Sequence, residues 1–167
     1  MALAPEDPWA SYERTVVEIL RPGGSSLRVR SAPDVDVDED RLPWPDRQPV
    51  HLLTAWDPGP ERPGVDINRM RQAALQADLE LLSGQLLVAI GVDSATGRRE
   101  EGLAVRGVPE AEVLALGVRY GQDAVFAWKP AEWAIVACQG GRRQASGWSL
   151  VVPEPGFRFS RASDTPI

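Results

Sequence analysis

The residues best suited to chemistry lie where an apolar stretch passes into a helical pattern. The segment HLLTAWDPGPERPGVDINRMR at 51–71 contains Thr54, Asp57, Asn68 and Arg71. A carboxylate can serve as a general base or hold a cation, a guanidinium can hold an anion, and hydroxyl and amide groups orient polar ligands. If a strand ends here and a helix begins, the free N–H groups of the helix face the strand end, and an anion or small polar ligand could bind there.

That junction also has a purely structural interpretation. Asp57-Pro58-Gly59 is typical of a turn, in which the acid and the proline begin the reversal and the glycine completes it. Asp57 would itself repel an anion and would favour a cation or a hydroxyl donor. The residue types therefore leave the nature of the ligand open.

Two further polar groups could join the same site. Gln122 stands between a predicted helix and a predicted strand, and burying its amide without partners would cost a few kcal/mol. If the strand that contains Thr54 and the strand that follows Gln122 are neighbours, Gln122 can approach the junction only if the two run antiparallel, which the sequence leaves undecided. Glu101 belongs to the mixed-charge stretch 98–101, which is more typical of cross-strand pairing than of catalysis, but it remains a candidate carboxylate.

Several other chemistries are disfavoured. The single His51 and the single Cys138 cannot supply a zinc site of the common kind, and a lone histidine at a strand start is more often structural than catalytic. Neither of the common glycine-rich nucleotide motifs is present. The acids at 34, 36 and 38 resemble the start of a calcium loop, but Glu39 and Pro45 occupy the positions that need glycine and glutamate. We therefore predict no metal and no cofactor.

Composition limits the class of protein. Of 167 residues, 43% are hydrophobic and 25% are charged, as in ordinary folded proteins, and the net charge of −6 with scattered arginines disfavours nucleic-acid binding. The N-terminal stretch lacks a signal-peptide pattern, and the longest apolar run, 86–92, is too short to span a bilayer. Seventeen arginines against one lysine suggest a GC-rich bacterial genome. We expect a cytoplasmic protein that does not bind membranes, of undetermined oligomeric state.

The elements that must position these residues follow from periodicity and turn signals. Helices are predicted at 8–20, 66–82 and about 110–120, strands at 26–30, 50–56, 85–92, 99–106, 123–128, 132–138 and 148–152, and an acidic, proline-rich loop at 33–49. This order predicts an α+β fold, with a mixed or mostly antiparallel sheet and about three helices packed on it. Residues 1–152 would form a single domain and 153–167 a loose tail.

The helix predicted at 66–82 has the clearest pattern. Its apolar residues recur at steps of three and four, which predicts that they face the core. They are Ile67, Met70, Ala74, Ala77 and Leu81, flanked by Leu75, Leu79 and Leu82. The polar face carries Arg69, Gln72, Gln76 and Glu80.

The same residues carry a family resemblance. The stretch HLLTAWDPG at 51–59, Asn68, Glu101 and YGQDAVFAW at 120–128 together resemble the bacterial family of domain of unknown function 3293, over about residues 10–128. Asp57 and Asp123 stand where that family usually has asparagine, and Tyr120 stands where it has phenylalanine. The resemblance supports the fold unit and the place of the site, and it implies no activity.

Three functions remain open. The first is a binding module in which Thr54, Asp57, Asn68, Arg71, Glu101 and Gln122 surround a small polar ligand or a polar segment of a protein partner. The second is a small enzyme with Asp57 or Glu101 as general base and Arg71 as electrostatic clamp. The third is a protein-interaction domain that uses some of its six tryptophans as interface anchors, for which exposure of Trp44 would be the test.

Overall fold

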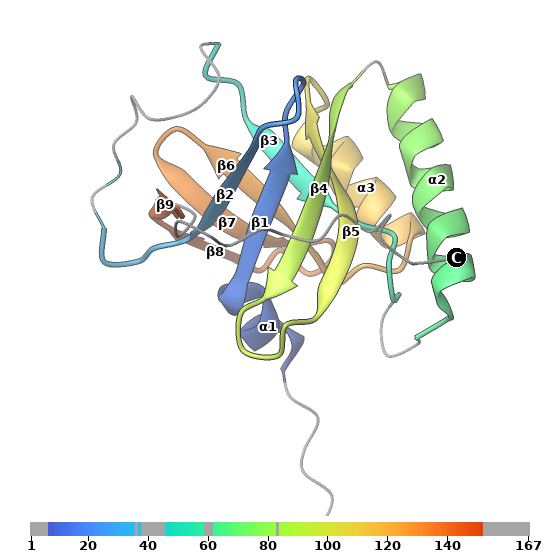
Figure 1. Ribbon diagram of the computed structural model, residues 1–167, viewed down its shortest axis with the longest axis horizontal. Helices are drawn as coiled ribbons and strands as arrows, with labels where there is room; N and C mark the ends of the chain where they lie inside the picture. Colours follow the sequence, from blue (N-terminus) through green and yellow to red (C-terminus); the bar gives the residue numbers. More distant parts are fainter. Residues whose placement is uncertain (1–6, 36, 38–45, 59–61, 83, 152–167) are drawn as a thin grey trace, which may run out of the picture.

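One strongly curved sheet and three helices make up the protein (Figure 1). The computed structural model describes residues 7–35, 37, 46–58, 62–82 and 84–151. The helices are α1 (Pro8–Arg14), α2 (Val65–Leu81) and α3 (Glu110–Arg119). The strands are β1 (Thr15–Leu20), β2 (Ser26–Ser31), β3 (Val50–Leu53), β4 (Gln85–Asp93), β5 (Arg99–Arg106), β6 (Ala124–Lys129), β7 (Glu132–Ala137), β8 (Arg143–Ser146) and β9 (Trp148–Leu150). The α+β class predicted from the sequence is confirmed.

The nine strands are ordered β8-β7-β6-β3-β5-β4-β1-β2-β9, and every neighbouring pair is antiparallel. The two outermost strands, β8 and β9, are consecutive in the chain and are separated only by Gly147. Ala32 N–H donates to the Gly147 carbonyl at 2.9 Å, and the Ser31 and Ser146 hydroxyls lie 2.7 Å apart. The segment 143–150 thus joins both ends of the sheet and nearly closes it into a barrel.

Gly147 lies at the bend of this closing segment. A Cβ atom there would come within 2.7 Å of the carbonyl oxygens of Ala32 and Val35, which are backbone atoms. Only glycine fits so close to another main chain without displacing it.

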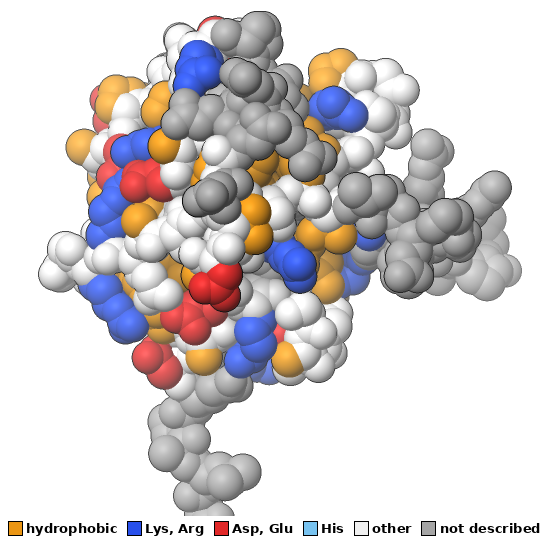
Figure 2. Space-filling model, turned by 90° about the vertical axis from the view of Figure 1, so that its left-hand side faces the viewer, with side chains coloured by type: hydrophobic (Ala, Val, Ile, Leu, Met, Phe, Trp, Pro, Cys, Tyr) orange, Lys and Arg blue, Asp and Glu red, His pale blue; other side chains and the backbone are white. Residues whose placement is uncertain are grey.

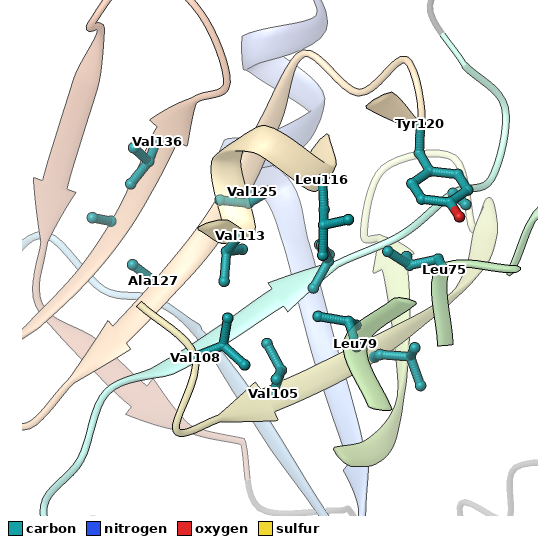
Figure 3. Packing of buried hydrophobic residues seen from close by; sticks show 14 residues of the cluster. Leu75, Leu79, Val105, Val108, Val113, Leu116, Tyr120, Val125, Ala127 and Val136 are labelled. Carbon is teal, nitrogen blue, oxygen red and sulfur yellow. The ribbon is translucent and has the colours of Figure 1, made fainter. Parts of the chain in front are cut away.

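Side-chain alternation along the strands separates two cores. Inside the curved sheet, Trp128, Trp133 and Trp148 pack edge to face, with ring centroids 6.1 and 5.1 Å apart. Outside it, Leu75 and Leu79 of α2 and Val113 and Leu116 of α3 pack on β3, β5 and β6 (Figure 3). The tryptophans fill one end of the barrel, which leaves space at the other end.

The N-terminal helix is shorter than the periodicity predicts. Asp7 caps α1 by accepting from Trp9 N–H at 3.0 Å, as expected, but the helix ends at Arg14, and residues 15–20 form β1. The prediction of a helix over 8–20 was wrong there because Thr15, Val16, Val17 and Ile19 are β-branched and pack better on a pleated sheet. Val17 and Ile19 point into the barrel core.

The second helix has the predicted bounds to within a residue, but a different face of it is buried: the flanking Leu75 and Leu79 face the core, and the central stripe does not. The buried face carries Asn68, Gln72, Leu75 and Leu79, whereas the stripe predicted to face the core is exposed. Two polar residues take core positions because they hydrogen-bond the loop that precedes the helix.

The structure confirms the hairpin predicted at 85–106, the helix predicted at about 110–120 and the strand predicted at 123–128, which is β6. The C-terminal prediction of two strands missed β8, which pairs with β7 across Gly140-Gly141, while β9 pairs with β2 at the opposite edge. Most of the acidic loop, including Asp36, Asp38 and Trp44, lies outside the described residues, as does the tail 153–167.

Candidate functional site

An open cleft of about 810 Å³ occupies the end of the barrel that the tryptophans leave unfilled. Its floor is apolar and includes Leu52, Phe126 and Ile135 from three neighbouring strands. Its rim is polar and comes from four places: α1, the β4–β5 turn, the loop between β3 and α2, and the start of β6. An apolar hollow at a barrel mouth with a few converging polar groups is a typical setting for a small-molecule site.

Thr54 directly follows β3 at the edge of this cleft. Its hydroxyl donates to the Glu101 carbonyl and accepts from Trp56 N–H at 3.0 Å. The Thr54 side chain thereby takes the place of the next main-chain hydrogen bond between β3 and β5. This explains why β3 ends at Leu53 rather than at Trp56. Gln72 supports the same turn, since its Oε1 accepts from Ala55 N–H at 2.9 Å.

Asp57 is held in an unusual backbone conformation, with φ of +42°. Asn68 stabilises it from below: Asn68 Oδ1 accepts from Asp57 N–H at 3.0 Å, and Asn68 Nδ2 donates to Asp57 Oδ1 at 2.8 Å. The other carboxylate oxygen forms an ion pair with Arg98 at 2.5 Å. A non-glycine residue with positive φ is strained, so these bonds are what keep the carboxylate at the cleft rim.

Arg71 and Gln122 tie the end of α3 to the same loop. Arg71 donates through Nε to the Ala55 carbonyl at 3.0 Å and through a terminal nitrogen to the Tyr120 carbonyl. Gln122 Nε2 donates to the Trp56 carbonyl at 3.0 Å. These contacts exist because β6 runs antiparallel to β3, so the predicted condition for convergence of Gln122 with the junction is met.

Five of the six residues proposed from the sequence divide into two groups. Thr54, Asp57 and Gln122 line the cleft. Asn68 and Arg71 stand behind it and hydrogen-bond the loop, and the residues lining the described part of the cleft do not include the first turn of α2.

Glu101 is the sixth, and its side chain lies on the other side of the sheet. It shares a strand face with Leu103 and Val105, which pack under the helices, while Glu100 faces the cleft. The carboxyl group of β5 that lines the cleft is thus that of Glu100, one position away.

Glu100 is a carboxyl of the cleft whose pKa is raised. Burial raises its pKa above the ordinary 4.5, and the nearby Asp57 carboxylate raises it further, against the lowering effect of Arg98 and Arg62. Arg98 lies 2.8 Å from Glu100 and also binds Asp57, so one guanidinium serves two carboxylates. Among the described residues that line the cleft there are five carboxyl groups and three arginines, so negative charge is in excess.

Tyr12 of α1 covers the same region. Burial raises the pKa of its hydroxyl well above the ordinary value of 10, and Asp123 and Glu100 raise it further. Its ring packs edge to face on Phe126, with centroids 6.2 Å apart. The hydroxyl thus stays protonated at neutral pH, as a hydrogen-bond donor beside two acidic residues.

A network around Asp93 anchors α1 over the cleft. Asp93 accepts from Arg14 Nε and a terminal Arg14 nitrogen at 3.2 and 3.0 Å, and from Ser11 Oγ at 2.8 Å. It also accepts from Ala95 and Thr96 N–H, which caps the β4–β5 turn. Principally because of the hydrogen bonds from Arg14, the pKa of Asp93 lies far below its ordinary value.

His51 is remote from this chemistry. It is buried at the other end of β3, and its Nε2 lies 3.0 Å from Glu110 Oε2. Burial raises the pKa of Glu110, but the hydrogen bond from His51 and the charge of Arg143 more than offset this and leave it below its ordinary value. Within the described residues, no group of three or more His, Cys, Asp or Glu side chains is placed to hold a metal ion.

Three further observations concern the surface charge, the helices and the tryptophans. On the face that carries β8 and β9, acidic and basic side chains are interspersed rather than gathered into a basic patch (Figure 2). Among the described helices, none combines the length and apolar character needed to cross a bilayer. Four tryptophans, at 9, 128, 133 and 148, are buried and Trp56 is half-buried, so these residues mainly fill the interior.

Sequence reasoning missed Tyr12, Glu100 and Asp123 as cleft residues. Strand alternation could have identified Glu100, because Leu103 and Val105 mark the helix-facing side of β5 and leave position 100 on the opposite side. Tyr12 could not be found this way, since its place depends on the break between α1 and β1.

A family model described as a protein of unknown function (DUF3293) matches residues 53–125. The resemblance inferred from HLLTAWDPG, Asn68 and YGQDAVFAW is therefore confirmed, and the matched range contains the β3–α2 loop, Glu100 and Gln122. Neither the comparison with curated proteins nor that with solved structures found a match.

Proposed function

We propose that the cleft binds a small amphiphilic molecule whose polar end is a cation, such as a protonated amine, and whose other part is apolar. The apolar part would lie on Leu52, Phe126 and Ile135, and the cationic end beside Glu100 and Asp123. The observation that carries this proposal is the raised pKa of Glu100 in a cleft where Arg98 already serves two carboxylates.

Charge selects a cation over an anion. An anionic ligand would enter beside Asp57, Glu100 and Asp123 and would add repulsion to a site that is already acidic. A cation would offset part of the excess negative charge of the lining and favour the ionised form of Glu100. The protonated Tyr12 hydroxyl can donate to a ligand oxygen, and the Gln122 amide can orient a polar end group.

The test is a matched series of ligands with the same alkyl chain and a terminal amine, alcohol or carboxylate. We expect the amine to raise the melting temperature most, in proportion to the logarithm of its concentration, and the carboxylate to have no effect. Glu100→Gln should weaken amine binding about tenfold or more, because a charge-assisted hydrogen bond is lost. Glu112→Gln, on the exposed face of α3, is the matched control and should bind as the wild type does.

Proton release gives an independent readout. Because binding of a cation favours ionised Glu100, the complex should release a fraction of a proton near the raised pKa of this carboxyl. Calorimetry in two buffers of different ionisation enthalpy measures this release directly. Preference for the carboxylate ligand, or equal binding by Glu100→Gln, would refute the proposal.

A small enzyme is the second candidate, and a specific observation favours it. A carboxyl with a raised pKa in a cleft is suited to general acid–base catalysis, and Glu100 has that property. Both carboxylate oxygens of Asp57 are already bonded, and Arg71 is engaged with two carbonyls behind the cleft. Any ligand found by the screen can be followed by NMR over hours: chemical change that Glu100→Gln abolishes would support catalysis, and an unchanged ligand would support binding alone.

A further inference from the structure

The outward face of α2 carries an apolar stripe that the fold leaves exposed. Its five members recur at helical spacing along one side of the helix, and we call them the outer stripe: Ile67, Met70, Ala74, Ala77 and Leu81. Met70 is 72% exposed and Leu81 is 83% exposed, values close to those of free side chains. The outer stripe does not line the cleft and takes no part in the proposed ligand binding.

The distribution of residues on α2 departs from that in an ordinary surface helix. Its buried side includes Asn68 and Gln72, whose amides hold the β3–α2 loop, while the most apolar stripe points to solvent. A continuous apolar stripe at the surface indicates a contact surface, because single scattered apolar residues are common but aligned ones are not.

We propose that the outer stripe is the contact surface between two copies of this chain, with the two α2 helices packed antiparallel about a two-fold axis. If the axis passes midway between Ala74 and Ala77, Met70 of one copy lies against Leu81 of the other. The small alanines at the centre let the backbones approach closely, and the long side chains at both ends fill the remaining space. This arrangement makes the stripe complementary to itself, as a two-fold interface requires.

Charge complementarity selects the antiparallel arrangement. Arg69 and Glu80 are eleven residues apart, about three helical turns, so both lie along the same edge of the outer stripe. In an antiparallel pair about a two-fold axis, like edges meet, which brings Arg69 of one copy beside Glu80 of the other and forms the same pair twice. Both side chains are exposed, and Glu80 Oε1 also accepts from Gln76 Nε2 of the same helix at 3.0 Å.

One helix from each copy gives an interface at the lower end of the specific range, below about 1,200 Å² in total. The dimer is therefore reversible and concentration-dependent. Analytical ultracentrifugation of the wild-type protein, from about 1 μM to about 1 mM, should show a shift from monomer to dimer.

The charge reversals provide the decisive test. Arg69→Glu and Glu80→Arg should each weaken the dimer about tenfold, since each places like charges together, and the double variant Arg69→Glu/Glu80→Arg should restore wild-type association. Leu81→Glu should abolish the dimer, whereas Val35→Glu, an equally apolar-to-acidic change at an exposed site off α2, should leave it intact. Circular dichroism melting confirms that each variant is folded.

Three results would overturn the proposal. The first is a wild-type protein that stays monomeric over the whole range, which would assign the outer stripe to a different partner. The second is a dimer that Leu81→Glu leaves unchanged. The third is a double charge reversal no better than the single ones, since an antiparallel register with Arg69 beside Glu80 requires the rescue.

Discussion

Replacing Asn68 should destabilise the protein more than any surface change on the same helix. Asn68 is 2% exposed, accepts from Asp57 N–H, and donates to the Asp57 carboxylate at 2.8 Å. A neutral hydrogen bond contributes about 1 kcal/mol and one to a charged group about 1.5–3 kcal/mol. Asn68→Ala should therefore lower the free energy of unfolding by about 3 kcal/mol, and Asp57, at φ +42°, would lose its main support.

Urea denaturation followed by tryptophan fluorescence measures this change, provided that the m-value stays constant. Gln76→Ala is the matched control: Gln76 is an exposed residue on the same helix, and its change should cost less than about 0.5 kcal/mol. If Asn68→Ala and Gln76→Ala unfold at the same urea concentration, the assigned role of Asn68 is wrong.

A near-isosteric variant separates shape from charge. Asn68→Asp keeps the size of the side chain but sets a second carboxylate against Asp57. At neutral pH both acids are ionised and repel, so the destabilisation should equal or exceed that of Asn68→Ala. Because the repulsion requires both acids to be ionised, the loss should be greatest at neutral pH and should shrink as the pH falls toward about 4, where aspartates become protonated. A penalty that does not vary with pH would contradict the electrostatic part of this reasoning.

Three other predictions concern separate parts of the molecule. The folded-state pKa of Asp93 lies far below its ordinary 3.8. The ionised carboxylate therefore stabilises the protein fully above pH 3.8, and this stabilisation is lost as the pH falls from 3.8 toward the folded-state pKa. The difference in urea midpoint between wild type and Asp93→Asn should narrow from about pH 6 to about pH 2. Gly147→Ala would place a Cβ 2.7 Å from two carbonyl oxygens and should lower the free energy of unfolding by about 1–3 kcal/mol, whereas Gly64→Ala, at a site with open space, should cost less. Burial raises the pKa of Cys138 from 9.0 to about 11, so its thiol should react with a disulfide reagent at pH 8 about a hundredfold more slowly in the folded protein than in urea; equal rates would refute the assigned burial.

Local signals predicted much of the fold correctly. The β4–β5 hairpin has a turn sequence between two apolar runs, and α3 has acids in its first turn and an arginine in its last, so neighbouring residues specify both. Where two elements compete for the same residues, the tertiary structure decides. Residues 15–20 fit a helical spacing and a strand alternation alike, and pairing with β2 and β4 selects the strand.

The candidate site, too, was only partly predictable from local sequence signals. The position of the β3–α2 loop could be inferred from the sequence because Asp57, Asn68 and Arg71 are close in the chain. Which of these side chains faces the cleft could not be inferred from the sequence, because this depends on the register between strands that are distant in the chain. Glu100 and Glu101 differ only in the side of β5 from which they project, and one position of offset separates a cleft residue from one under the helices.

The closing segment of the barrel also has a consequence for how the chain folds during synthesis. Val29 pairs with Leu150, so the ring of strands cannot be completed until residue 150 has left the ribosome. Pairings between such distant residues generally form slowly. In the interval, β2 and β7 both present unsatisfied main-chain groups, and the eight residues 143–150 cover them together. Translation that stops before Arg143 would release a chain in which the edges of β2 and β7 are both unpaired. We expect such truncated products to associate through these strand edges rather than remain monomeric.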